Sequence, residues 1–138
     1  MIKEFIGIWE ANKGSLRRHY QEKGMPSNYK EVVKNVVKML EDNLTNEYDF
    51  GKPDSSKVHE IDDGHYQGML VYLFPNKDYQ PTTYWGVTVF YGSCSGCDTL
   101  QHILEDTNKE QQLNDIMTES LHVIQGIKLL FDEYDNDL

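Results

Sequence analysis

Residues 57–91 read KVHEIDDGHYQGMLVYLFPNKDYQPTTYWGVTVFY and decide the fold class. Asp62-Asp63-Gly64 is a hairpin signal, because an Asp-Gly pair tolerates positive φ. β-branched and aromatic residues, which are enriched in strands, dominate the segments on either side of this turn and one further segment. The three predicted strands are residues 57–61, 65–74 and 83–91. Because the turn-rich residues 75–82 join the last two, the sequence predicts an antiparallel meander.

The third of these strands has bulky side chains on both faces. One face carries Trp85, Val87, Val89 and Tyr91, and the other carries Tyr84, Thr88 and Phe90. Strands with apolar residues on both faces are typical of the middle of a covered sheet. We therefore expect this strand to be central and covered on both sides.

Two helices are predicted before the strands. In residues 2–22 the apolar side chains recur at helical spacing, and Gly24 and Pro26 end the pattern. Gly14 weakens this helix by about 1 kcal/mol relative to alanine, so a bend or a break is expected there. Ser27 is the expected N-cap of a second helix over residues 28–44.

Two more helices are predicted after the strands. Asp98 is the expected cap of a short helix over residues 98–105, and a longer helix is expected over residues 109–133. The apolar stripe of the longer helix runs from Leu113 to Phe131. The order ααβββαα predicts one α+β domain over residues 1–138, with a three-stranded antiparallel meander packed by four helices.

Charge is unevenly distributed along the chain. The 138 residues carry a net charge of −10, yet residues 1–40 carry +4 and residues 41–138 carry −14. This balance disfavours direct nucleic-acid binding, and the asymmetry can orient a partner or favour head-to-tail contact between copies, so a homo-oligomer is one expectation. A local basic patch on the two N-terminal helices is the exception; its members are Arg17, Arg18, Lys30, Lys34 and Lys38.

The N-terminal sequence MIKEFIGIWE has no signal-peptide pattern, and the apolar runs are too short to span a bilayer. Two cysteines cannot form a disulfide framework for a chain of this length. We therefore expect a cytoplasmic protein with reduced thiols and no membrane association.

The segment YGSCSGCDTLQ, residues 91–101, joins a predicted strand to a predicted helix and holds both cysteines. Thiols near a helix N-terminus have a lowered pKa and can bind metal. Zinc takes four Cys or His ligands, and the candidates are Cys94, Cys97, His102 and His122. The fourth zinc-knuckle position is Thr107, which departs from that motif. A redox pair and a purely structural connection remain alternatives, although no proline follows the CxxC as in thioredoxin-like sites.

A small-molecule or nucleotide pocket is another alternative at this segment, because amides at a helix N-terminus suit phosphate. The candidate binding residues are Tyr66, Gln67, Tyr91, Ser93, Ser95, Asp98 and Gln101. No nucleophile elbow, zinc-protease motif, P-loop or dinucleotide fingerprint occurs, so no catalytic residue is assigned.

Several blocks of the sequence resemble a set of small bacteriophage proteins of unknown function. The shared blocks are Asp-Asp-Gly-x-Tyr-Gln-Gly at residues 62–68, Tyr79-Gln80-Pro81, the YGSCSGCDTLQ block and a late Leu121-His122-x-x-Gln125. The resemblance covers roughly residues 60–130 and implies a phage origin, but no particular activity. Small acidic phage accessory proteins commonly act by binding. We therefore expect stoichiometric binding to, and inhibition of, a host or phage protein in the bacterial cytoplasm, as in anti-defence proteins.

Overall fold

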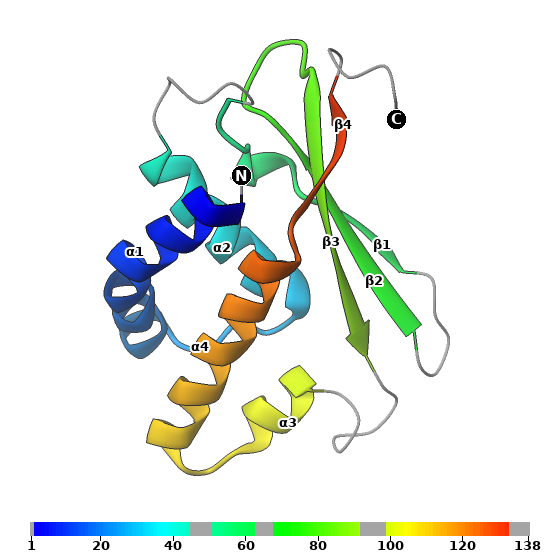
Figure 1. Cartoon of the computed structure of the whole chain (residues 1–138). Helices are drawn as coiled ribbons and strands as arrows, with labels where there is room; N and C mark the ends of the chain where they lie inside the picture. The colour runs from blue at the N-terminus through cyan, green and yellow to red at the C-terminus, as the bar shows by residue number, and fades with distance from the viewer. Residues whose placement is uncertain (1, 45–50, 63–67, 92–98, 133–138) are drawn as a thin grey trace.

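The computed structural model describes residues 2–44, 51–62, 68–91 and 99–132, and its backbone confirms the α+β class. Figure 1 shows a helical layer beside a twisted sheet. The helices are α1 (Ile2–Lys23), α2 (Tyr29–Asn43), α3 (Thr99–Glu105) and α4 (Lys109–Gly126), with a short 3-10 turn η1 (Ser55–Lys57). The strands are β1 (His59–Asp62), β2 (Gly68–Pro75), β3 (Thr83–Tyr91) and β4 (Lys128–Asp132).

The sheet is an antiparallel meander with the strand order β1-β2-β3-β4. In its central pair, Gly68 lies opposite Tyr91 and Phe74 lies opposite Trp85. This register places Leu70, Tyr72 and Phe74 on the same face as Trp85, Val87 and Val89, and all six are buried. That face therefore forms the sheet side of the core.

The helical layer covers only this face of the sheet. The buried stripe of α2, Val32, Val33, Val36, Val37 and Leu40, meets Phe5, Trp9 and Tyr20 of α1 and Ile116 and Ile124 of α4 in one cluster. Arg17 on α1 donates to Asn114 Oδ1 of α4 at 3.0 Å, and the Tyr20 hydroxyl lies 2.9 Å from Ser120 Oγ. These contacts join α1 and α4, which are far apart in the sequence.

The start of the helical layer differs from the prediction in two places. The helix α1 runs through Gly14 without a break, because its buried residues on both sides of the glycine pack on the same core. The N-cap of α2 is Asn28, not Ser27: Asn28 Oδ1 accepts from the Glu31 amide at 2.9 Å. The Ser27 amide instead donates to the Glu31 carboxylate at 2.7 Å, which completes a reciprocal cap.

A fourth strand replaces the end of the predicted last helix, so the prediction of three strands was wrong. The helix α4 ends at Gly126 and the chain then pairs with β3, with Trp85 opposite Leu129 and Gly86 opposite Lys128. A Cβ at Gly126 would lie 3.2 Å from Val87 Cγ2, so the glycine lets the helix end approach the sheet closely. The backbone hydrogen bonds that β4 forms with the second edge of β3 stabilise the fold more than a continued helix would.

The prediction that the third strand is covered on both sides was also wrong. Phe90 is 74% exposed and Tyr84 is 37% exposed, although β3 is indeed central in the sheet. Their neighbours on the same face include Ile61 of β1, Leu73 of β2 and Leu130 of β4. No described helix lies on this side of the sheet in Figure 1. We call the sheet side that carries Ile61, Leu73, Tyr84, Thr88, Phe90 and Leu130 the open face.

Candidate functional site

The YGSCSGC part of the cysteine segment lies largely outside the described residues. So do seven of the candidate site residues: Tyr66, Gln67, Ser93, Cys94, Ser95, Cys97 and Asp98. The elements on either side agree with the predicted connection, because β3 ends at Tyr91 and α3 begins at Thr99. The proposed zinc site and the proposed phosphate pocket therefore stay predictions.

The two candidate histidine ligands lie on different helices. His102 is exposed on α3, and His122 is exposed in the fourth turn of α4, where its Nδ1 lies 3.9 Å from Glu119 Oε2. At 1.5 Å per residue, His122 is about 20 Å along the axis from Lys109, whereas α3 packs beside the beginning of α4 in Figure 1. Within the described residues, no three His, Cys, Asp or Glu side chains form a group that could hold a metal ion.

The two described members of the candidate pocket have ordinary structural partners. The Tyr91 hydroxyl donates to Asp62 Oδ1 of β1 at 2.6 Å, and the Gln101 amide lies 3.5 Å from Glu105 Oε1 on the surface of α3. The Tyr72 hydroxyl makes a similar bond to Glu60 Oε1 at 2.7 Å. Burial, and then this bond, raise the pKa of Tyr72, so its hydroxyl stays protonated at neutral pH. These pairs turn the β1 carboxylates toward the helical side of the sheet.

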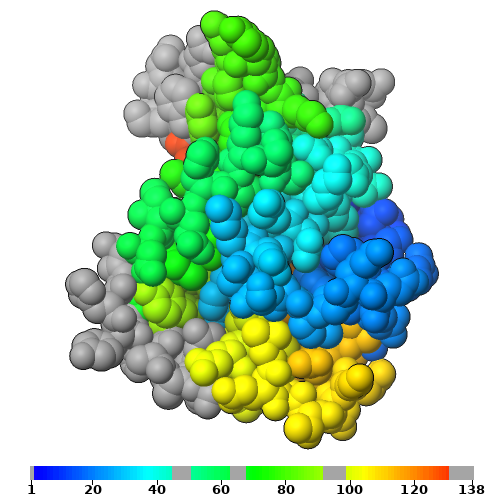
Figure 2. All heavy atoms as spheres, turned by 180° about the vertical axis from the view of Figure 1, so that it is seen from behind, coloured from blue at the N-terminus to red at the C-terminus, as the bar shows by residue number. Residues whose placement is uncertain are grey.

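The most strongly charged described element is the hairpin of α3 and α4. Residues 99–126 hold five carboxylates and a single lysine, a net charge of −4 with neutral histidines. The carboxylates are Glu105, Asp106, Glu110, Asp115 and Glu119. We call this surface the acidic hairpin. Figure 2 shows its turn, coloured yellow, at one end of the molecule beyond α1 and α2.

Hydrogen bonds join the two helices of the acidic hairpin to each other and to α1 and α2. The Tyr29 hydroxyl accepts from the Leu100 amide at 2.9 Å, and Gln112 donates to the Ile103 carbonyl at 3.1 Å. Arg17 donates to Glu110 at 3.1 Å and so neutralises one of the five carboxylates. Glu105, Asp106 and Asp115 each accept a hydrogen bond from a neighbour within the hairpin, which reduces the side-chain freedom that binding would cost.

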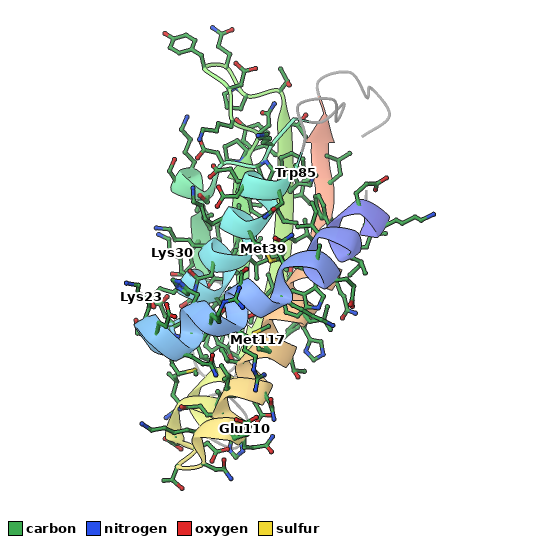
Figure 3. All side chains as sticks on the ribbon, turned by 90° about the vertical axis from the view of Figure 1, so that its left-hand side faces the viewer. Lys23, Lys30, Met39, Trp85, Glu110 and Met117 are labelled. Atoms are coloured by element: carbon green, nitrogen blue, oxygen red, sulfur yellow. The ribbon has the colours of Figure 1, made fainter. Side chains whose placement is uncertain are left out.

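The predicted basic patch is divided in the structure. Arg17 pairs with Glu110, and Lys38 pairs with Glu41 and Asp42 at 3.1 and 3.2 Å. Among the described residues, no carboxylate forms an ion pair with Lys23 or Lys30, which Figure 3 places on the same side of the helical layer. A crevice of about 320 Å³ between α1 and α2 borders Lys23 and also Lys34. The remaining patch is small, and Glu31 lines the same crevice.

Glu41 forms a buried polar cluster at the end of α2. Its side chain is 7% exposed and accepts from Lys38 Nζ at 3.1 Å and from the amide and hydroxyl of Ser55 at 3.3 Å each, and Lys77 Nζ lies 3.6 Å away. Burial alone would raise the pKa of this carboxyl. The bonds from Lys38 and Ser55 and the charge of Lys77 together hold it below its ordinary value. The cluster ties α2 to η1 and to the end of β2.

Comparisons with known proteins give no match: no family model, no curated protein and no solved structure is similar to this chain. None of the helices in the described part of the chain is long and apolar enough to cross a membrane. The function must therefore be inferred from the residues of this chain. Two features distinguish its described surface, the acidic hairpin and the open face.

Proposed function

We propose that this protein is a phage accessory protein that binds a host or phage protein stoichiometrically in the bacterial cytoplasm and inhibits it. The observation that carries the proposal is the acidic hairpin, which concentrates five carboxylates at one end of a chain of net charge −10. The resemblance of the YGSCSGCDTLQ block to small phage proteins supports the setting. An anti-defence role is one form of this proposal.

The chemistry of the partner follows from the hairpin. A group of surface carboxylates attracts a basic protein surface, raises the association rate and repels acidic competitors. Protein surfaces that bind the phosphate backbone of a nucleic acid are positively charged, so they are complementary to the acidic hairpin. The hairpin would then inhibit a nucleic-acid enzyme by occupying the channel that its substrate uses.

Capture from lysates of infected host cells tests the proposal with charge-neutral variants. We expect the tagged wild-type chain to retain one partner at low salt, and Glu105→Gln combined with Asp115→Asn to bind it about three- to tenfold more weakly. Each of these two carboxylates accepts a bond from a glutamine of its own helix, and an amide oxygen can accept the same bond, so the fold should be unchanged. Duplex DNA or heparin should displace the partner.

The matched control removes two carboxylates elsewhere. Glu10→Gln combined with Asp78→Asn changes the net charge by the same amount and should leave capture unchanged, since both side chains are exposed on other elements. Equal loss in both double variants would show that net charge alone matters, and recovery of no partner at low salt would contradict the proposal.

A further inference from the structure

The open face is an apolar surface without a cover among the described residues. Phe90 is 74% exposed, Ile61 is 50% exposed and Leu130 is 44% exposed, and they come from three strands of the one sheet. Contiguous exposed apolar side chains of this kind mark a surface that binds another protein surface. Scattered apolar residues would need no such explanation, but here Met69, Val71 and Leu73 of β2 lie between them on the same face and make the apolar surface continuous.

The open face also lacks carboxylates in its described part, although the chain carries 23 acidic residues. The two carboxylates of β1, Glu60 and Asp62, lie opposite Tyr72 and Leu70 and therefore belong to the helical side. The described side chains of the open face that can carry a positive charge are His59 and Lys128, one on each edge strand. Two copies of this strongly acidic chain can therefore approach through the open face without opposing carboxylates.

The relief of the open face suits contact with an identical surface. Along β3, the residues on this face are Tyr84, Gly86, Thr88 and Phe90, with large residues at both ends and small ones in the middle. A Cβ at Gly86 would lie 2.5 Å from Leu130 Cδ1 and 3.2 Å from Leu73 Cδ2, so the glycine makes room for these leucines on the surface. Gly86 is buried beneath these leucines, so the exposed residues of β3 on this face are Tyr84, Thr88 and Phe90, with an aromatic side chain at each end.

We propose that the open face binds the open face of a second copy of this chain, giving a two-fold symmetric dimer. In such an interface the same patch meets itself. A two-fold axis at the level of Val87 places Phe90 of one copy across from Tyr84 of the other, and Thr88 of one copy across from the leucines that cover Gly86 of the other. The two sheets then pack face to face, as in a β-sandwich, with the helical layers outside.

The size of the face is sufficient for a reversible dimer. With 8 and 9 residues, β2 and β3 are about 26–30 Å long, and four strands about 4.8 Å apart span about 14–19 Å. With side-chain relief this amounts to roughly 500 Å² per copy, or on the order of 1,000 Å² in total, the lower bound for a specific interface. We therefore expect dissociation in the micromolar range of protein concentration.

Sedimentation velocity and light scattering over about 1–500 μM test the proposal, because this range spans a micromolar equilibrium. We expect the wild-type chain to shift from monomer to dimer. Thr88→Glu places two carboxylates near the axis and changes no buried residue, so it should stay monomeric with an unchanged circular dichroism spectrum and melting temperature. Phe90→Glu should also be monomeric.

Two matched control variants introduce a glutamate at positions outside the open face. Thr118→Glu is the same substitution at an exposed position of α4, and Tyr79→Glu removes an aromatic side chain that is 95% exposed beyond β2; both should dimerise like the wild type. Because the proposed contact is apolar, raising the salt concentration should leave the dimer intact.

Three results would overturn the proposal. A monomeric wild-type chain throughout the range excludes a second copy as the occupant. If that monomer loses capture of its partner on Thr88→Glu, the face belongs to a partner protein instead. A dimer that persists in Thr88→Glu and dissociates in high salt identifies a head-to-tail contact between charged regions. None of these outcomes depends on the acidic hairpin variants.

Discussion

Glu41 shows how a single buried side chain makes the stability of this fold depend on pH. Its pKa is held below the ordinary value of about 4.3. The ionised carboxylate therefore stabilises the folded state above that pH, and the stabilisation is lost as the pH falls through the folded-state pKa. We expect Glu41→Gln to lower the free energy of unfolding by about 1–2 kcal/mol at pH 7. The difference from wild type should shrink as the pH falls through the folded-state pKa of Glu41.

Urea unfolding at a series of pH values measures this effect, and Asp42→Asn is its control. Asp42 pairs with the same Lys38 but is 55% exposed, so its replacement should cost less than about 0.5 kcal/mol at every pH. An equal loss in both variants would mean that the charge of Lys38, and not the buried cluster, determines the effect.

At the residue scale, the sequence predicts side chains that act through their neighbours in the chain and misses those with distant partners. The helix over residues 2–22 was predicted correctly as α1, because the helical spacing of its apolar residues is visible in the sequence alone. Arg17 was predicted in a basic patch, whereas it binds Glu110, 93 residues away. No local sequence pattern predicts this ion pair, because the two side chains come close only when α1 packs on α4.

Among the elements, β4 shows where periodicity misleads. Ile124, Ile127 and Phe131 continue the helical spacing of three and four residues, so a helix to residue 133 was the natural prediction. In the structure Ile127 is the C-cap and Leu129 packs against the core from the fourth strand. The spacing of apolar residues does not show that the chain after residue 126 can pair with the second edge of β3. The remaining helices and strands agree with the predicted order because each has its own periodicity and turn signals.

Two glycines, one inside α1 and one just after it, should respond in opposite ways to the same substitution. Gly14 lies inside α1, where an added methyl group would have no neighbouring atom within 4 Å, so Gly14→Ala should stabilise the protein by about 0.5–1 kcal/mol. Gly24 has equal space but a φ of +94°, so Gly24→Ala should destabilise it by about 1 kcal/mol. Urea unfolding midpoints measure both; a stabilising Gly24→Ala would contradict the assigned end of α1.

For the whole molecule, the two proposed interaction surfaces lie on opposite sides of the sheet. The acidic hairpin belongs to the helical layer, and the open face is directed away from it (Figure 1). Both can therefore be occupied at once, and charge and apolar contact are separated in space. The sequence shows how charge is distributed along the chain but not how it is distributed in space, which depends on the sheet register that turns Glu60 and Asp62 away from the open face.

This arrangement predicts the composition of the complex with the partner. Above the dimer dissociation constant, light scattering should give a complex with two copies of each protein, and Thr88→Glu should give one copy of each. The affinity of each hairpin for its partner should be the same in both, since residue 88 is on the other side of the sheet. A one-to-one complex of the wild-type chain at high concentration would show that partner binding and self-association exclude each other.

The packing of α1 on α4 has a consequence for folding during synthesis on the ribosome. Tyr20 meets Ser120 across 100 residues of sequence, so α1 is made first and receives its neighbour last. At roughly 5–20 residues per second, this delay lasts about 5–20 s. Throughout that time the apolar stripe of α1, with Phe5, Trp9 and Leu16, lacks its α4 neighbour. The nascent chain therefore offers chaperones an amphipathic helix that the finished protein conceals.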